Sequence, residues 1–180
     1  MAAFTVIDHT ELGASATSWE ATGISGSYDH LYLVASVRSD RATTYDTAKL
    51  QLNGETGSDY SYTNLYADGA PSASSVKSAG VSSAAFIHCN DITGASNTAN
   101  TFANVTVWIP NYANTANYKQ VLVQTGRSTA STTAYYWTVS LTAGLLTADT
   151  AAITGMKLYP STGPNWVQYS TFTLYGVTGA

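Results

Sequence analysis

The sequence predicts an all-β protein, an antiparallel β-sandwich of about ten strands with little or no helix. Two observations support this fold class. Short runs of alternating apolar and polar residues recur along the chain, and clusters of Gly, Asn, Asp, Ser and Pro separate them. No segment shows the periodicity of a long amphipathic helix. At 180 residues, a single domain spanning 1–180 is expected.

The clearest strand is the segment 30–39, in which every second residue from Leu31 to Val37 is apolar. This period of two is typical of a strand with one buried face. Further runs, many of them rich in β-branched and aromatic residues, predict the other strands. In chain order they are 4–8, 15–21, 48–52, 59–63, 84–89, 102–109, 118–125, 133–142, 153–159 and 166–177.

A tight turn is predicted where the segment 48–52 ends. The next two residues are Asn53 and Gly54, a pair that readily adopts positive φ. The segment 59–63 then alternates again between polar and aromatic residues. The sequence therefore predicts a hairpin between 48–52 and 59–63.

Charged residues are scarce, at 10% of the chain, and the formal net charge is −4. Chains that stay disordered through self-repulsion carry a higher net charge. The 13 Tyr, 4 Trp and 4 Phe also bring large apolar areas to a core otherwise made of small residues. The composition therefore predicts a folded domain rich in Thr and Tyr.

The same composition argues against several kinds of partner and location. The 7 Lys and Arg residues form no basic stripe, so we expect no nucleic acid to bind. No stretch approaches the roughly 18 apolar residues of a membrane span, so we expect no membrane. The amino terminus lacks the features of a signal peptide, and the single cysteine, Cys89, precludes an internal disulfide. We therefore expect synthesis in a host cytoplasm.

Patterns for catalysis and metal binding are absent from the sequence. There is no Gly-x-Ser-x-Gly elbow, phosphate-binding glycine loop or paired zinc motif. His88 and Cys89 are adjacent, and neighbours on a strand point to opposite faces, which favours a half-buried His beside a buried Cys. We therefore expect a protein that is not an enzyme, with no cofactor and no metal; a hydrolase is a minor alternative.

The loop 38–46 gathers charge in a chain that otherwise avoids it. We expect it to contact neighbouring proteins through Arg38, Asp40, Arg41, Tyr45 and Asp46. Calcium binding by loop aspartates, including Asp59, is an alternative, because sandwich loops bind calcium without a sequence motif. Pairing of these aspartates with the loop arginines, or capping of turns, is favoured over calcium.

The loop 67–83 is the second expected contact region. It is low in complexity and contains no aromatic residue. Loops of this length usually carry contacts or lie disordered. The candidate contact residues in it are Asp68, Pro71 and Lys77.

Aromatic residues are the abundant material for recognition, because Tyr and Trp are large and amphipathic. We nevertheless expect all four tryptophans to pack in the core or at sheet edges. They are Trp19, Trp108, Trp137 and Trp166. Four tyrosines are expected in cross-strand rows on the outer face, where they would support the sheet or meet a partner subunit. They are Tyr32, Tyr60, Tyr62 and Tyr66.

Several stretches of the sequence resemble small jelly-roll proteins of tailed bacteriophage virions. They are FTVIDHTELGASATSWEATGI from Phe4, YDHLYL from Tyr28 leading into VRSDR from Val37, LQLNGETGSDYSY from Leu50, and FTLYGV from Phe172. The resemblance covers most of the chain and carries no catalytic or ligand motif. It implies a jelly-roll sandwich and a structural role, as a head decoration or cement protein or a fibre tip, most often a homotrimer.

Composition and resemblance together predict a non-enzymatic virion structural protein. We expect it to bind the major capsid protein or other virion proteins as an oligomer and to stabilise the head. A surface poor in Lys and Glu suits lasting protein contacts. The alternative is a carbohydrate-binding module, or a receptor-binding tip of a tail or head fibre, that binds glycan through exposed Trp or Tyr.

Overall fold

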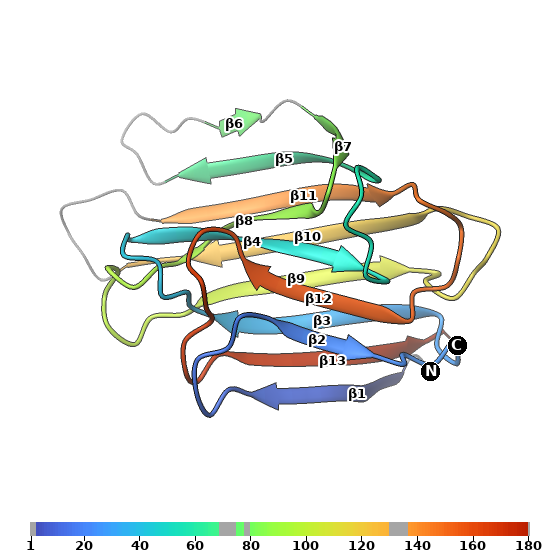
Figure 1. Ribbon diagram of the computed structural model, residues 1–180, viewed down its shortest axis with the longest axis horizontal. Coiled ribbons are helices and arrows are strands. Elements are labelled where there is room, and N and C mark those ends of the chain that lie inside the picture. Colours follow the sequence, from blue (N-terminus) through green and yellow to red (C-terminus); the bar gives the residue numbers. More distant parts are fainter. Residues whose placement is uncertain (1–2, 69–74, 78–79, 130–136, 180) are drawn as a thin grey trace.

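The computed structural model describes residues 3–68, 75–77, 80–129 and 137–179. Within these residues the protein is all-β, with thirteen strands and no helix (Figure 1). The described part of the chain thus contains no helix that is long and apolar enough to cross a membrane.

The thirteen strands are short to medium in length. The first seven are β1 (Ala3–Glu11), β2 (Trp19–Thr22), β3 (His30–Val37), β4 (Tyr45–Leu52), β5 (Tyr60–Asp68), β6 (Ser75–Lys77) and β7 (Val81–Ala84). The other six are β8 (Ile87–Thr93), β9 (Ala103–Pro110), β10 (Lys119–Arg127), β11 (Thr138–Leu146), β12 (Gly155–Pro160) and β13 (Thr171–Thr178).

The strands form two antiparallel sheets. The large sheet has the order β1-β13-β3-β9-β10-β11-β5-β6, with β7 also pairing with β5, and the small sheet has the order β2-β12-β4-β8. Every pairing between these strands is antiparallel. Figure 1 shows the small sheet lying over the part of the large sheet that contains β13, β3, β9 and β10. The predicted antiparallel β-sandwich is therefore confirmed.

Eight of the strands pair in a nested manner. Strand β1 pairs with β13, β2 with β12, β3 with β9 and β4 with β8. The chain passes from the large sheet to the small sheet and back as it enters these strands in turn. Strands β5–β7 and β10–β11 are additions between them, and they widen the large sheet beyond the edge strand β8.

The apolar core lies between the sheets and contains two of the predicted packing tryptophans. Trp19 stacks on Phe172 with 5.4 Å between ring centroids, and Trp166 meets the same ring edge-on at 5.9 Å. The Trp166 indole N–H donates to the Leu158 carbonyl at 3.1 Å, which satisfies its polar atom. From Leu31 to Val37, every second side chain is buried, as the alternation predicted.

The predicted hairpin between 48–52 and 59–63 is wrong. Asn53 and Gly54 do adopt positive φ, at 53° and 73°, but the chain then crosses to the other sheet. Strand β4 pairs with β12 and β8, whereas β5 pairs with β11. Tyr60 is buried, and its hydroxyl accepts from the Leu52 N–H at 2.9 Å and donates to the Leu52 carbonyl at 3.2 Å. The Tyr60 side chain thus bonds the end of β4, whereas a strand paired with β4 was expected at this position.

The number of strands also exceeds the predicted ten or so. The extra strands lie mainly among the added strands β5–β7. Strand β5 continues to Asp68, and the short strands β6 and β7 pair with it. Two predicted strands begin later than expected, since β2 starts at Trp19 and β13 at Thr171. Trp166 instead forms isolated bridges to Ala16 and Ser39.

Candidate functional site

The outward-facing side of the large sheet, called here the outer face, carries one continuous row of directly paired residues. In sheet order from β1 to β5 the row is Val6, Tyr175, Tyr32, Trp108, Leu122, Ala143 and Thr63. Neighbours in such a row pack side by side along the sheet. The row therefore joins residues from seven strands that are distant in the sequence.

An aromatic cluster occupies the β1 side of the outer face. It consists of Phe4, His30, Tyr32, Trp108 and Tyr175, and is called the aromatic ridge. Phe4 is 59% exposed and lies edge-on to Tyr32 and Tyr175, with ring centroids 6.0 and 5.9 Å apart. Trp108 contacts Tyr32 at 6.0 Å and His30 at 4.9 Å. Each ring contacts at least one other ring of the cluster, so the aromatic ridge is a continuous apolar feature of the outer face.

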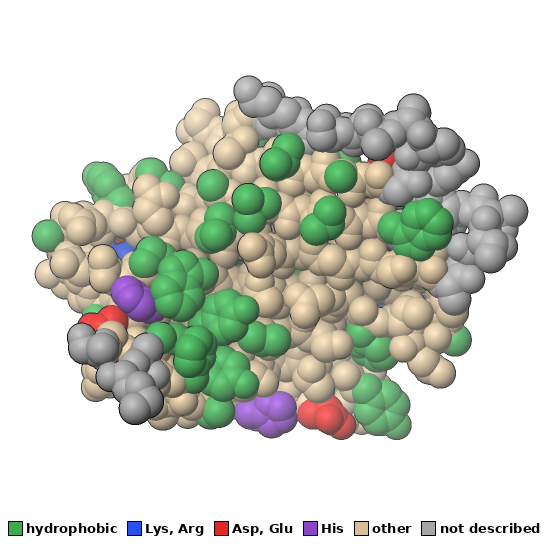
Figure 2. All heavy atoms as spheres, turned by 180° about the vertical axis from the view of Figure 1, so that it is seen from behind, with side chains coloured by type: hydrophobic (Ala, Val, Ile, Leu, Met, Phe, Trp, Pro, Cys, Tyr) green, Lys and Arg blue, Asp and Glu red, His purple; other side chains and the backbone are tan. Residues whose placement is uncertain are grey.

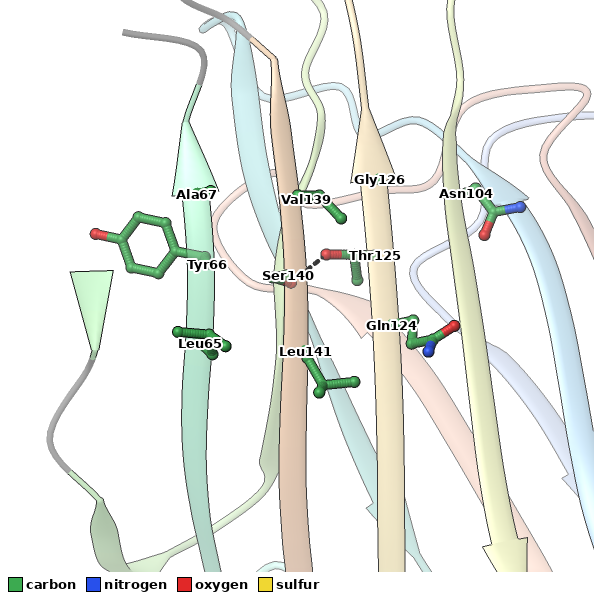
Figure 3. Close-up of a pocket in the computed structure, with 10 residues that line it drawn as sticks. All are labelled: Leu65, Tyr66, Ala67, Asn104, Gln124, Thr125, Gly126, Val139, Ser140 and Leu141. Atoms are coloured by element: carbon green, nitrogen blue, oxygen red, sulfur yellow. Dashed lines mark hydrogen bonds between the residues drawn. The ribbon is translucent and has the colours of Figure 1, made fainter. Parts of the chain in front are cut away.

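A shallow hollow, called the depression, lies on the other half of the outer face over β9, β10, β11 and β5 (Figure 3). Its volume is about 580 Å³. Gly126 pairs with Val139 on one side and with Asn104 on the other, and it leaves a gap because it has no side chain. Leu65 and Val139, 54% and 63% exposed, stand beside this gap. Small residues thus form the floor and aliphatic residues the walls.

Charge is almost absent from the sheet that forms this face. The five adjacent strands β13, β3, β9, β10 and β11 contain only two Asp, Glu, Lys or Arg residues, Lys119 and Arg127. Both side chains are buried and so do not contribute to the outer face. Figure 2, which views the molecule from behind, shows hydrophobic side chains spread over this face and charged ones at its margins.

The outer side of the small sheet is different, because it carries the charged residues Glu20, Lys49 and Lys157. The ammonium of Lys157 lies 2.8 Å from the carboxylate of Glu20 across strands β12 and β2. The ammonium of Lys49 lies over the ring of Phe86, 4.4 Å from its centroid. This side therefore has the solvated character of an ordinary protein surface.

The predicted contact loop 38–46 proves to be bonded mainly to the protein itself. Arg38 is only 8% exposed, and its guanidinium donates to the backbone carbonyls of Ala95, Asn97, Thr98 and Thr101 at 2.7–3.1 Å. These bonds tie the loop between β8 and β9 to the end of β3. Burial lowers the pKa of Arg38 from its usual value.

The two aspartates of this loop cap turns. Asp46 is fully buried; it accepts the Gly163 N–H at 2.8 Å and lies 3.7 Å from the Arg41 guanidinium. Asp40 accepts two hydrogen bonds from Asn165, from the backbone N–H at 3.0 Å and from the side-chain amide at 2.7 Å. This arrangement confirms the interpretation favoured over calcium. Among the described residues, no group of three or more His, Cys, Asp or Glu is placed to hold a metal ion.

Tyr45 is the exposed member of the predicted loop set. It is 41% exposed, and the guanidiniums of Arg41 and Arg127 lie 5.1 and 5.4 Å from its ring centroid. Two cations hold one tyrosine ring at the end of the sandwich. Contact between this loop and other proteins stays a prediction, with Tyr45 as its main surface residue.

The second predicted loop is only partly described. Asp68 ends β5 and is half-buried. Lys77 ends β6, where its backbone pairs with Leu65, and Pro71 lies outside the described residues. The structure therefore leaves this contact region as a prediction.

Beneath the added strands a group of polar side chains, called the polar interior, lies beside the apolar core. Thr142 donates its hydroxyl to the side-chain carbonyl of Asn64, whose amide contacts Nδ1 of His88 at 3.4 Å. Arg127 forms an ion pair with Asp91 at 3.3 Å. Burial lowers the pKa of His88. In this network a neutral His88 accepts the Asn64 amide hydrogen.

Cys89 has no role in that network. It is fully buried, and burial raises the pKa of its thiol, so the reactive thiolate is disfavoured. His88 is half-buried and belongs to the alternate side of β8, as the sequence predicted. These two neighbours therefore do not form a nucleophile and base pair.

The aromatic predictions are confirmed for some residues and wrong for Trp108, Tyr60 and Tyr62. Trp19 and Trp166 are buried in the core, whereas Trp108 lies half-buried on the outer face and Trp137 is 41% exposed. Tyr32 belongs to an outer row as expected, but Tyr60 and Tyr62 point inward. The Tyr60 hydroxyl bonds the end of β4, and the Tyr62 ring stacks on His88 with 5.9 Å between centroids. The sequence did not reveal that Phe4 and Tyr175 join Tyr32, since this requires the strand order.

Comparison with known proteins adds no relative. No protein-family model matches the chain, and neither the curated proteins nor the solved structures give a significant match.

Proposed function

We propose that this protein is a non-enzymatic structural protein of a bacteriophage virion, which decorates the capsid and stabilises the head by protein–protein contacts as an oligomer. The observation that carries the proposal is the outer face of the large sheet. Solvated sheet faces place polar and charged side chains outward. Here an aromatic ridge and an aliphatic depression share a face whose five adjacent strands β13, β3, β9, β10 and β11 expose no charged side chain. Contiguous exposed apolar surface marks sites of protein interaction.

The strand order supports the jelly-roll part of the proposal. Two Greek keys in a double sheet define that fold. The four nested pairs, with β13 next to β3 and β12 next to β4, follow such an arrangement, and β5–β7 and β10–β11 are insertions into it. This agrees with the resemblance to virion jelly rolls. The insertions supply half of the outer face, which makes them part of the proposed contact surface.

The buried charged side chains and the cysteine support a structural role as well. Arg38 and Asp46 bond backbone groups, and Cys89 is buried as a thiol. Lys119 is 2% exposed and donates to three carbonyls, of Asn114, Asn117 and Thr150, at 2.6–2.8 Å. Such groups hold loops in place at both ends of the sandwich, giving the rigid frame that a cementing protein requires.

A binding assay tests the proposal. Capsids of the encoding phage, prepared without this protein, are mixed with the purified chain, and bound protein and resistance of the capsids to heat are measured. We expect saturable binding and increased heat resistance. Absence of binding, together with a reproducible hit on a glycan array, would contradict the proposal and favour a glycan-binding tip domain. The virion location is tested by the same experiment.

A matched pair of variants locates the capsid contact. Tyr45→Ala removes the exposed ring at one end of the sandwich, and Tyr118→Ala removes a 53% exposed ring at the opposite end of β10. If the loop 38–46 contacts the capsid with Tyr45 as its central ring, Tyr45→Ala weakens binding by about tenfold or more, as for a hot-spot tyrosine. Tyr118→Ala is expected to bind as the wild type does. Equal effects of the two changes would contradict the role of the loop.

A further inference from the structure

We infer that the outer face of the large sheet packs against the same face of a second copy of this chain about a two-fold axis, with the aromatic ridge of each copy in the depression of the other. The inference rests on the proposed structural role and names the partner of its main surface. It leaves the end of the sandwich with Tyr45 free to contact other virion proteins.

The first support is the relief of the face. The ridge covers β1, β13, β3 and β9 with large aromatic rings, of which Phe4 is 59% exposed, whereas the depression opens over β9, β10, β11 and β5 (Figure 3). A raised and a hollow feature thus lie side by side on one surface. Rotation by 180° about an axis between them places each raised feature over the hollow of the other copy, which is the self-complementarity that a two-fold interface requires.

The second support is the absence of charge. In a two-fold interface, residues near the axis contact the same residues of the other copy. A charged residue near the axis would therefore face an identical charge. The outer side of the small sheet would bring Lys49 and Lys157 close to their own copies. The outer face of the large sheet brings together uncharged groups such as Thr106, Gln124 and Leu122. Self-association therefore brings no like charges together near the proposed axis on this face.

The third support is the size of the face. The paired row crosses seven strands, so it is about 29 Å long at roughly 4.8 Å per strand. The rows from His30 to Ser36 add a width of about 20 Å at roughly 3.4 Å per residue. The resulting area of about 600 Å², before side-chain relief is counted, approaches the roughly 800 Å² per partner of a standard interface.

The orientation of the two features favours a dimer over the expected homotrimer. A three-fold ring needs two complementary patches that point in directions well apart, so that successive contacts close the ring. The ridge and the depression lie on one sheet face and point in similar directions. Face-to-face packing of two copies satisfies both features at once.

A mass measurement on the full chain tests the inference, by light scattering or sedimentation over a range of concentrations. We expect the wild type to have twice the 18.9 kDa chain mass. Gly126→Trp is designed to fill the depression, and the added Cβ meets no atom within 4 Å. We expect at least a tenfold weaker dimer. Gly13→Trp, at an exposed glycine with equally open surroundings, is the matched control and should dimerise normally.

A crosslink provides a second measurement that does not depend on Gly126. Thr106 lies on β9 between the ridge and the depression, so the proposed axis passes near it. Thr106→Cys should give a disulfide-linked dimer on mild oxidation, whereas Thr22→Cys on the small sheet should stay monomeric under denaturing conditions. The buried Cys89 does not interfere.

The outcomes separate this inference from the proposed function. A monomeric or trimeric wild type, or dimerisation that Gly126→Trp leaves intact, overturns the two-fold packing even when capsids still bind the protein. A dimer without the Thr106→Cys crosslink overturns the placement of the axis. A dimer that behaves as expected but binds no capsid supports the packing and removes the virion role instead.

Discussion

The two outer sides of this sandwich differ, although both belong to one small domain. The small sheet exposes an ion pair between Lys157 and Glu20, with Lys49 nearby. The large sheet exposes Phe4, Trp108 and their neighbours, with no charged residue in its five adjacent strands that reaches the surface. The charged residues of the small sheet indicate that its outer side stays in water. The other side is suited to contact with protein.

The largest expected effect comes from two glycines that face opposite sides of the large sheet. A Cβ at Gly144 would lie 2.8 Å from the side chain of Ile87, whereas one at Gly126 meets nothing within 4 Å. Gly144→Val should therefore destabilise the fold by about 2–4 kcal/mol through overpacking. Gly126→Val should change stability by about 0.5 kcal/mol or less. Urea unfolding measures both.

Those two variants test whether side chains on the outer face contribute to the stability of the fold. A loss of stability at Gly126→Val that equals the loss at Gly144→Val would show that the depression is part of the folding core. The comparison between the two sides of the sandwich would then have to be abandoned.

A smaller effect is expected from pH, and it belongs to the polar interior rather than to either outer side. Burial lowers the pKa of His88, so the unfolded chain takes up a proton near pH 6.5 while the folded protein does not. The unfolded state then binds more protons, and stability falls as pH decreases below about 6.5. Protonation also removes the acceptor at Nδ1 for Asn64, a bond whose contribution is about 1 kcal/mol.

The midpoint of thermal unfolding between pH 7.5 and 5 measures this effect. We expect it to drop with pH in the wild type and to drop less in His88→Gln. The exposed histidine His9 provides the control, because His9→Gln should preserve the wild-type pH dependence. An unchanged pH dependence in His88→Gln would contradict the role given to the polar interior.

The smallest effect is expected at the ion pair of the small sheet. The hydrogen bond from Lys157 lowers the pKa of Glu20, but both side chains are about half exposed. Exposed pairs contribute about 0–1 kcal/mol, so Glu20→Gln should change the free energy of unfolding by roughly 0.5 kcal/mol or less. A larger loss, or a change in oligomer mass, would show that this side is more than a solvated surface.

The sequence predicted the features that depend on neighbouring residues. Alternation between Leu31 and Val37 correctly identified a strand and its buried side, and Asn53-Gly54 correctly identified a turn. A turn dipeptide does not specify which sheet the next strand joins, so the hairpin prediction failed. The next strand joins the other sheet, where Tyr60 is buried and its hydroxyl bonds Leu52.

The candidate surface was harder to predict, because distant segments form it. Arg38 suggested an exposed loop, yet its carbonyl partners lie 57–63 residues along the chain. Tyr32 and Trp108 each lie in a predicted strand, but their pairing in one row depends on β3 lying beside β9. Alternation in the sequence predicts which side chains of a strand share a face. The order of the strands in the sheet determines which residues of different strands become neighbours.

Side-chain labelling in assembled particles tests the difference between the two outer sides most directly. Hydroxyl-radical oxidation of Phe4, Tyr32 and Trp108 and acetylation of Lys49 and Lys157 are measured by mass spectrometry, in virions and in dilute free protein. We predict strong protection of the three aromatic residues in the virion and unchanged reactivity of the two lysines. Protection of the lysines with freely oxidised aromatics would contradict the account.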